Sequence, residues 1–241
     1  GHSGRPGPWP HALLVEFNRS PAASRALASR LFHVQGLARQ FAALCVGAQP
    51  GQKVADLCAA PGGKSLTLAE CMQNQGKLIS GEYVESRVPL LRKAFARCGV
   101  TCAKAVQNDA AQLRSDWGKF DRILCDVPCS GLGVIAKKPD IRYKDLDGIE
   151  NLLLSQQKIL QNGADLLAEN GRLVYSTCTV NRDENEEQVK TFLENNPRFH
   201  VAVPALQLPG MQQGEYGTLF LPHKTATDGF FAAILETEST Q

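Results

Sequence analysis

The sequence has no large excess of charge, no long apolar run, no internal repeat and no low-complexity tract. Its 26 lysines and arginines nearly balance its 24 aspartates and glutamates, which leaves a formal net charge of +2. This balance differs from the strongly basic composition of proteins that coat nucleic acid, so any RNA contact must come from a local basic patch. No apolar stretch is long enough to cross a bilayer, and we therefore expect no membrane association.

The Cys-x-x-Cys pairs typical of many zinc sites are also missing. The chain has eight cysteines but no Cys-x-x-Cys pair, and its five histidines are not grouped with them. Cys98 with Cys102 and Cys125 with Cys129 are spaced by four, but a zinc site built from them is improbable. Several cysteines stand in apolar runs, where a small buried hydrophobic residue would serve. We expect free thiols, no metal and a reducing compartment, the cytoplasm.

An alternation of strand-like and helix-like segments occupies most of the 241 residues and is typical of a parallel sheet with crossover helices. Strands are expected at 54–56, 78–82, 104–107, 122–126 and 172–176, and helices at 36–47, 64–70, 86–97, 149–168 and 183–195. Two closing strands, 217–221 and 230–235, are expected to pair antiparallel. The pattern predicts an α/β, Rossmann-like fold with a mostly parallel, seven-stranded sheet and an antiparallel closing strand.

The first residues differ in composition, because 1–30 are rich in glycine, proline, serine and arginine. We expect residues 1–35 to form a short N-terminal extension or linker, the remnant of an upstream substrate-binding element. A strand-like run at 31–35 would end it. Residues 36–241 are expected to form one α/β domain, and the protein is expected to be a monomer.

A strand, a tight turn and a helix follow one another between Val54 and Glu70. The turn reads Cys58-Ala59-Ala60-Pro61-Gly62-Gly63-Lys64. Such a unit directs backbone N–H groups and a helix N-terminus at a ligand, and small side chains let that ligand approach the backbone. A nucleotide or nucleoside cofactor is the expected ligand.

One interpretation of the turn is a phosphate-binding P-loop. Gly63, Lys64 and Ser65 match the end of that motif, whereas Cys58 stands where its first glycine belongs. Asp126, at the end of a later strand, could serve as the metal-binding acid of such an NTPase. The other interpretation is a pocket for S-adenosylmethionine, in which the turn meets an uncharged ribose and the methionine group.

Acidic residues at strand ends favour S-adenosylmethionine. Ligands of doubly wound sheets bind at the carboxyl ends of the strands, and four strands end in a carboxylate: Asp56, Glu82, Asp109 and Asp126. Such a ring of acids would repel a triphosphate and attract a sulfonium and an ammonium group. Glu82 lies 26 residues after Asp56, close to the spacing at which an acid accepts hydrogen bonds from a ribose diol. Any one of these acids taken alone is as readily a helix cap or a surface ion pair.

Two cysteines follow neighbouring strands, Cys129 after the fourth and Cys178 after the fifth. A thiolate is the best soft nucleophile of a protein. Carbon 5 of a pyrimidine becomes nucleophilic when a thiolate adds to carbon 6, and a base must later remove the carbon-5 proton so that the thiol can leave. The two cysteines suit this chemistry. Two buried structural cysteines are the alternative, and spacing does not say which thiol would attack.

Three motifs resemble those of the Sun/Fmu-type RNA 5-methylcytosine methyltransferases. They are Asp56-Leu-Cys-Ala-Ala-Pro-Gly-Gly-Lys64, Asp126-Val-Pro-Cys-Ser-Gly131 and Tyr175-Ser-Thr-Cys-Thr179, the last followed by Glu184-Asn-Glu186. The resemblance runs from about Phe32 to Leu235 and is greatest to the branch that modifies bacterial small-subunit ribosomal RNA. It implies a methyltransferase catalytic domain at 36–241, with S-adenosylmethionine as cofactor and RNA, first of all ribosomal RNA, as partner.

The resemblance also implies a role for each residue of the site. The cofactor would be held by Cys58, Ala59, Ala60, Pro61, Gly62, Gly63, Lys64, Glu82, Arg87, Asp109 and Asp126. Among these, Glu82 would take the ribose, Asp109 would lie near the adenine, and Asp126 would lie between cofactor and base. Cys178 would attack carbon 6, and Cys129 would assist proton removal and product release. Lys64 would reach the base or the methionine carboxylate.

Three departures from the family pattern stand out. Glu82 replaces the commoner aspartate, at the cost of one extra methylene. The usual Gln-Asp-x-x-Ser reads Gln35-Gly36-Leu37-Ala38-Arg39, which loses two polar groups used for substrate positioning. The loop Lys137–Tyr143 has lysine and tyrosine where the family has arginine and tryptophan. We expect it to face RNA phosphates, with one aromatic for stacking; a solvated basic loop is the alternative.

Three other functions stay open from the sequence. A P-loop NTPase would hydrolyse nucleotides, and a non-catalytic RNA-binding relative would lack the cofactor pocket. A methyltransferase for protein glutamine usually carries an Asn-Pro-Pro-Tyr motif after the fourth strand, where this chain has Asp126-Val-Pro-Cys129.

Overall fold

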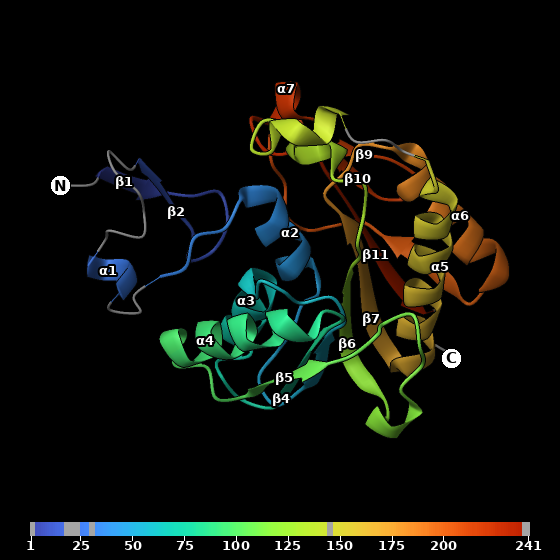
Figure 1. The fold of residues 1–241 in the computed structure, drawn as a ribbon, viewed down its shortest axis with the longest axis horizontal. Helices are drawn as coiled ribbons and strands as arrows, with labels where there is room; N and C mark the ends of the chain where they lie inside the picture. Colours follow the sequence, from blue (N-terminus) through green and yellow to red (C-terminus); the bar gives the residue numbers. More distant parts are fainter. Residues whose placement is uncertain (1–2, 17–24, 29–31, 144–146, 238–241) are drawn as a thin grey trace.

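The computed structural model describes residues 3–16, 25–28, 32–143 and 147–237. One large sheet has the strand order β5-β4-β3-β6-β7-β11-β10-β9, and β8 pairs with β11. Helices α2, α3 and α4 cover one face of this sheet, and α5 and α6 cover the other (Figure 1). The predicted α/β, Rossmann-like fold is therefore confirmed. Parts of the predicted extension and the end of the predicted domain lie outside the described residues.

Five parallel strands form one half of the sheet. In spatial order they are β5 Ala103–Gln107, β4 Lys77–Glu82, β3 Lys53–Asp56, β6 Phe120–Asp126 and β7 Leu167–Thr177. The connecting helices are α3 Gly63–Cys71, α4 Val88–Cys98 and α5 Ile149–Leu166. The strand order reverses between β3 and β6, because the chain first builds outward to β5 and then returns. In open α/β sheets, ligands bind beyond the carboxyl ends of the strands at such a reversal.

Antiparallel strands complete the sheet. β11 Phe230–Thr237 pairs antiparallel with β7 and with β10 Thr218–Phe220, as expected for the two closing strands. The predicted count of seven strands is wrong, because the described residues form nine strands in the large sheet. The additional strands are β8 Phe199–Ala202 and β9 Gln212–Gln213. β9, with two residues, is too short to show the alternation of apolar residues by which a strand is recognised, and β8, with four, was missed although its length allows that pattern.

Three further predicted boundaries are wrong. The helix expected at 149–168 ends at Leu166, and the strand expected from 172 already begins at Leu167, which pairs with Phe120 of β6. The helix expected at 183–195 begins only at Glu186, as α6 Glu186–Asn195. Residues Arg182–Glu184 form a separate 3₁₀ turn, which buries Glu184 completely.

Strand β11 is apolar on both faces because helices cover both sides of the sheet. Its alternate residues belong to two cores: Phe231, Ala233 and Leu235 pack with α5 and α6, and Phe230, Ala232 and Ile234 pack with α2 Leu37–Cys45. Successive side chains of a strand point to opposite faces. A strand buried on both faces therefore reads as a continuous apolar run, which made this one predictable.

The N-terminal extension contains a hairpin of β1 Ser3–Pro6 and β2 Leu13–Glu16, separate from the large sheet (Figure 1). Trp9, between the two strands, is buried against Phe41 of α2, with ring centroids 5.8 Å apart. Its Nε1 donates to the carbonyl oxygen of Leu37 at 3.2 Å. The hairpin is thus attached to the helix that begins the domain.

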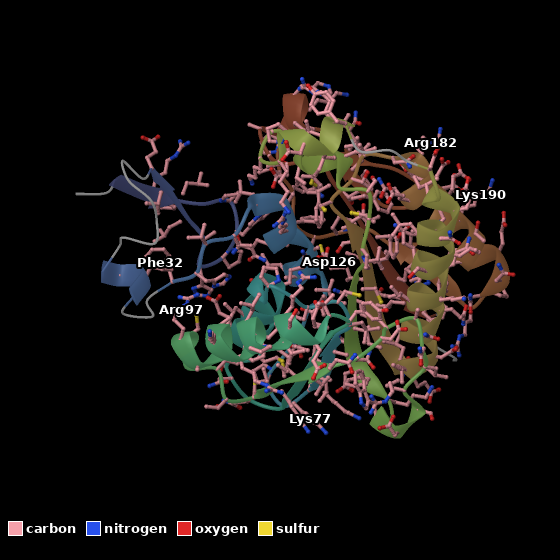
Figure 2. The ribbon with its side chains drawn as sticks, viewed as in Figure 1. Phe32, Lys77, Arg97, Asp126, Arg182 and Lys190 are labelled. Atoms are coloured by element: carbon pink, nitrogen blue, oxygen red, sulfur yellow. The ribbon has the colours of Figure 1, made fainter. Side chains whose placement is uncertain are left out.

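A short helix, α1 Arg25–Ala28, follows the hairpin in the chain. Arg97 of α4 donates from Nη1 to the carbonyl oxygens of Leu27, at 3.5 Å, and Phe32, at 3.3 Å. Arg97 and Phe32 lie side by side in Figure 2. The strand expected at 31–35 is wrong for residues 32–35, which have no regular structure, and residue 31 lies outside the described part.

Candidate active site

A cavity of about 960 Å³ opens where the strand order reverses, at the carboxyl ends of the parallel strands. Pockets for small ligands commonly fall between about 300 and 1,000 Å³. Apart from Gly62, all the residues predicted for the site line it: Cys58, Ala59, Ala60, Pro61, Gly63, Lys64, Glu82, Arg87, Asp109, Asp126, Cys129 and Cys178. Figure 2 shows Asp126 near the middle of the molecule. The fold therefore brings the three motifs together in one place.

The turn after β3 forms one wall of the cavity. Gly62 has φ +108°, and a Cβ there would lie 3.1 Å from Leu91 of α4, so the position needs glycine for its backbone and for close packing. Gly62 points toward α4, which explains why it does not line the cavity. Ala59 N–H donates to the carbonyl of Gly81 at 2.8 Å and ties the turn to β4. The first turn of α3 then presents its N-terminus to the cavity.

Glu82 is buried at the end of β4 and is held by three donors. Its Oε1 accepts from Val84 N–H at 3.0 Å and from Arg87 Nη1 at 3.2 Å, and its Oε2 accepts from Ala60 N–H at 3.3 Å. Arg87 also donates from Nη2 to the carbonyl of Ala60 at 3.2 Å. Arg87 therefore fixes the carboxylate against the turn, in the position predicted for a ribose acceptor.

Asp109 follows β5 and lines the cavity while its carboxylate closes the next turn. Oδ1 accepts from Ala111 N–H at 2.9 Å, and Oδ2 accepts from Gln112 Nε2 at 3.0 Å. Asn108, which the sequence did not single out, is buried beside it and also lines the cavity. Asp109 thus closes a turn, with no helix in this described segment for it to cap, and lines the pocket as well.

Lys64 and Asp126 form an ion pair across the strand reversal. Lys64 Nζ lies 2.6 Å from Asp126 Oδ2, and Ser176 Oγ donates to Asp126 Oδ1 at 2.8 Å. The side chain of Lys64 is 10% exposed and that of Asp126 is 26% exposed. A charge-assisted hydrogen bond at this depth fixes both groups at the cavity wall. The pair links the start of α3 to the end of β6.

Asp56 lies deeper, at the end of β3, and is fully buried. Its Oδ2 accepts from Ser65 Oγ at 2.7 Å, and Ser80 Oγ donates in turn to Ser65 Oγ at 3.0 Å. Oδ1 has no partner among the described residues. Burial raises the pKa of this carboxyl to about 7, against the lowering effect of the Ser65 hydrogen bond.

The raised pKa of Asp56 predicts a pH dependence of stability. The unfolded chain releases this proton near pH 4 and the folded protein only near pH 7, so the free energy of unfolding falls as pH rises between them. Asp56→Asn removes this ionisation. From pH 4.5 to 7.5 we expect the wild type to lose on the order of a few kcal/mol relative to the variant. Urea unfolding at both pH values measures this, and equal losses in both proteins would contradict it.

Cys129 and Cys178 face each other, with the two Sγ atoms 3.3 Å apart. The hydrogen bond with Cys129 lowers the pKa of Cys178 to about 7, helped by the charges of Arg39 and Lys64 and opposed by burial and Asp126. The same hydrogen bond, together with burial, raises the pKa of Cys129 well above its ordinary range. Near neutral pH the pair therefore combines a thiolate at Cys178 with a protonated donor at Cys129.

The mouth of the cavity is basic. Arg39, Lys137 and Lys138 line it, and Lys137 Nζ pairs with Asp228 Oδ2 at 2.7 Å. Gly36 stands where the family pattern has an aspartate. A Cβ at Gly36 would lie 3.5 Å from that Asp228 oxygen, so the Lys137–Asp228 ion pair lies next to this position. Gln35 accepts from Thr67 Oγ1 at 2.8 Å, and its Nε2 is a buried donor without a partner in the described part of the chain.

From the sequence, Arg39 appeared only as the residue that replaces the serine of the family pattern. In the structure it contributes a positive charge near the Cys178 thiol. We found no hydrogen bond or ion pair of Arg39 with a described residue, and nearby positive charge favours a thiolate. Arg39→Ser is therefore expected to raise the pKa of Cys178 above 7. The pH dependence of iodoacetamide labelling at Cys178, followed by mass spectrometry, measures this. Arg92→Ser on α4, outside the cavity, is the control, and an unchanged midpoint in Arg39→Ser would contradict the expectation.

The described residues contain no group of three or more histidine, cysteine or acidic side chains that could hold a metal ion. The eight cysteines are free.

In the described part of the chain, no helix has the length and apolar character needed to span a bilayer. Burial raises the pKa of Cys58 well above its ordinary range, so the thiol in the turn stays neutral.

The donor set of the cavity fits a nucleoside cofactor with a positively charged sulfonium. Four carboxyl groups line one cavity, those of Asp56, Glu82, Asp109 and Asp126, and the helix N-terminus of α3 faces the same space. Glu82 and Asp109 offer acceptors for hydroxyl and amino groups. Ser155 and Ile159 of α5 form another wall of the cavity. The sequence did not point to them, because its motifs stand in the turns after strands, and residues in the middle of a helix belong to no such motif.

Comparison with known proteins gives the family. The family model described as 16S rRNA methyltransferase RsmB/F matches residues 43–236. The chain is 38% identical over 207 residues to the probable ribosomal RNA small subunit methyltransferase B of Bacillus subtilis (strain 168), which covers 82% of this chain and 46% of that protein. It is 34% identical over 246 residues to the ribosomal RNA small subunit methyltransferase F of Cronobacter sakazakii, covering 95% and 51%. The chain spans about half the length of these curated relatives.

A solved structure agrees with these relatives. NSun6 from Pyrococcus horikoshii, determined with SFG, superposes with a TM-score of 0.83 at 30% identity, over 92% of this chain and 57% of that chain. The predicted resemblance is confirmed, and with it S-adenosylmethionine as the cofactor in place of a triphosphate. The chain belongs to the 16S rRNA methyltransferase RsmB/F family.

Proposed function

We propose that this protein methylates carbon 5 of a cytosine in RNA, with ribosomal RNA as the substrate, through a covalent adduct with Cys178. The observation that carries the proposal is the thiol pair at 3.3 Å, with a lowered pKa at Cys178, in the cavity that holds the Lys64–Asp126 ion pair. Bound S-adenosylmethionine supplies the methyl group. The residues of the chain bind it, hold the base and move protons.

Cys178 begins the reaction in this proposal. Its thiolate forms a bond to carbon 6, and the electron pair of the C5–C6 double bond makes carbon 5 nucleophilic. Asp126, held by Lys64 and Ser176, is positioned to hydrogen-bond the ring. The cavity wall is preorganised for this, because both carboxylate oxygens already have fixed donors.

Cys129 assists the second half of the reaction, in which the product is released. After carbon 5 has been methylated, its proton must leave, the C5–C6 double bond re-forms, and the bond from carbon 6 to sulfur breaks to return the Cys178 thiolate. The hydrogen bond and charge of Cys178 are two causes of the raised pKa of Cys129. Both causes disappear while Cys178 is bonded to carbon and burial remains, so the pKa of Cys129 falls; the thiol then releases its proton to solvent more readily and can accept the one from carbon 5.

We propose residues 36–241 as the catalytic domain, acting as a monomer in the cytoplasm, with residues 1–35 as an N-terminal extension or linker, the remnant of an upstream substrate-binding element. The basic mouth formed by Arg39, Lys137 and Lys138 supports contact with RNA phosphates. Tyr143 is 83% exposed, which leaves its ring accessible for stacking on a base. The target base must leave its stack to reach a thiol inside the cavity.

Transfer of a labelled methyl group tests the proposal. The protein is incubated with methyl-labelled S-adenosylmethionine and unmodified small-subunit ribosomal RNA, and the RNA is digested to nucleosides. Label in 5-methylcytidine is expected, and RNA in which the target cytosine is already methylated serves as the control. Label in another nucleoside, or no label, would contradict the proposed function.

A further inference from the structure

The two thiols lie on loops from different strands, so something must hold the loops together. Cys129 follows β6 and Cys178 follows β7, and the parallel ladder between these strands ends at the pair Asp126–Ser176. Beyond the ladder, two backbone hydrogen bonds join the loops, Val127 N–H to Ser176 at 3.0 Å and Gly133 N–H to Cys178 at 3.0 Å. The second of these bonds is accepted by Cys178 itself, but neither bond involves Cys129 or its neighbours Pro128 and Ser130.

Glu184 fills this gap from the 3₁₀ turn before α6. Its carboxyl group is fully buried and accepts from Ser130 N–H at 2.7 Å and from Ser130 Oγ at 2.5 Å. Gln156 Nε2 of α5 donates to Glu184 at 3.0 Å and to the carbonyl of Pro128 at 2.9 Å. The residues on both sides of Cys129 are therefore fixed by one carboxyl group and its neighbour.

The same turn also holds the loop of Cys178. Ser130 Oγ lies 2.9 Å from Thr179 Oγ1, which joins the residue after Cys129 to the residue after Cys178. Asn185 donates from Nδ2 to the carbonyl of Thr179 at 3.1 Å and accepts from Thr177 Oγ1 at 2.6 Å. Tyr175 OH donates to the Glu184 carbonyl at 2.6 Å. Each loop thus has side-chain bonds to Glu184–Asn185.

Burying the carboxyl group of Glu184 costs free energy, because the group loses its hydration. No lysine or arginine of the described residues pairs with Glu184, whose neighbours are neutral donors. Burial of such a group is compensated only when its hydrogen bonds are well placed, and networks of this kind fix a unique arrangement of the groups around them. The arrangement fixed here is the relative position of the two cysteine loops.

We infer that Glu184 is a positioning residue that sets the spacing of the Cys129–Cys178 pair through Ser130 and Thr179. This inference rests on the proposed function, because the spacing of the two thiols matters only if both take part in the reaction. Glu184 itself touches neither thiol. Its effect reaches the reaction through the hydrogen bond between the two sulfur atoms, which exists only while the loops are held together.

Two variants test this without relying on methyl transfer. Ser130→Ala keeps the backbone bond to Glu184 and removes the hydroxyl that bridges to Thr179. Glu184→Gln keeps the shape of the side chain and weakens the charge-assisted hydrogen bonds. In both, we expect the pH midpoint of iodoacetamide labelling at Cys178 to rise from about 7 toward the midpoint of Cys129→Ala, which lacks the donor altogether.

Thr218→Val is the matched control. Thr218 is a buried hydroxyl on β10 that donates to Gln213 Oε1 at 2.6 Å and does not line the cavity. Its removal tests for general destabilisation and should leave the Cys178 midpoint at the wild-type value. In the methylation assay, Ser130→Ala should lower kcat roughly tenfold with KM nearly unchanged, because positioning acts on the chemical step.

A wild-type midpoint at Cys178 in both Ser130→Ala and Glu184→Gln would overturn the inference. So would an equal rise in Thr218→Val, since the effect would then be one of stability. The labelling experiment contains no RNA, so the expected shift would stand even if the substrate proved not to be cytosine. Failure of the positioning role and failure of the proposed function are therefore distinguishable.

Discussion

Cys178→Ala is expected to lower methyl transfer to RNA by at least roughly 10³-fold, because it removes the attacking group of a covalent mechanism. The alanine fits the space of the thiol, so the cavity should persist. Binding of S-adenosylmethionine by calorimetry should stay within about threefold of the wild type, since Cys178 lies on the base side of the cavity in the proposal. Loss of transfer with retained cofactor binding would separate chemistry from folding.

Cys98→Ala is the matched control for this experiment. Cys98 is a partly buried cysteine at the end of α4 that does not line the cavity, and its replacement should leave transfer near the wild-type rate. A second signature follows from the pKa of about 7 at Cys178. The wild-type rate should rise from pH 6 to pH 8 as the thiolate forms and then level off. A Cys178→Ala protein with more than a tenth of wild-type activity would rule out the covalent role.

Strand ends were predictable because each is marked in the local sequence. The turn after β3 has small residues and glycines at fixed places, and the acids Asp56, Glu82, Asp109 and Asp126 each close a recognisable apolar run. The carboxyl ends of parallel strands meet at one edge, so the convergence of these residues followed from the fold class alone. Strand β9 was missed because two residues carry no periodicity, whereas β8 was missed although it is as long as the predicted β3.

Most contacts between the ends of different strands were not predictable; the approach of Cys129 and Cys178 is the exception, because their strands were expected to be neighbours. Lys64 and Asp126 bond only because β3 and β6 are neighbours, and the sequence does not state the lateral order of strands. Arg39 reaches the thiol pair from a helix that no motif connects to the fifth strand. Glu184 stands in a charged segment that favours an exposed helix, whereas the 3₁₀ turn at Arg182–Glu184 buries it. Tertiary packing decided these positions.

Cys129→Ala is expected to trap the covalent complex. Without Cys129, no thiol lies beside the adduct to accept the carbon-5 proton, so release of the product slows while attack by Cys178 continues. Incubation with RNA and S-adenosylmethionine should then give a protein–RNA species that survives denaturing electrophoresis, together with a large loss of turnover. Its formation should require the cofactor, and the double variant Cys129→Ala, Cys178→Ala should form none.

The thiol pair adds a pH signature to this trapping experiment. The hydrogen bond with Cys129 is the largest cause of the lowered pKa of Cys178, so its removal should move that pKa upward and make attack slower at pH 7. The adduct of Cys129→Ala should therefore accumulate faster at pH 9 than at pH 7, whereas wild-type turnover levels off above about pH 8. If adduct accumulates in Cys178→Ala and not in Cys129→Ala, the two thiols have exchanged roles and Cys129 is the nucleophile.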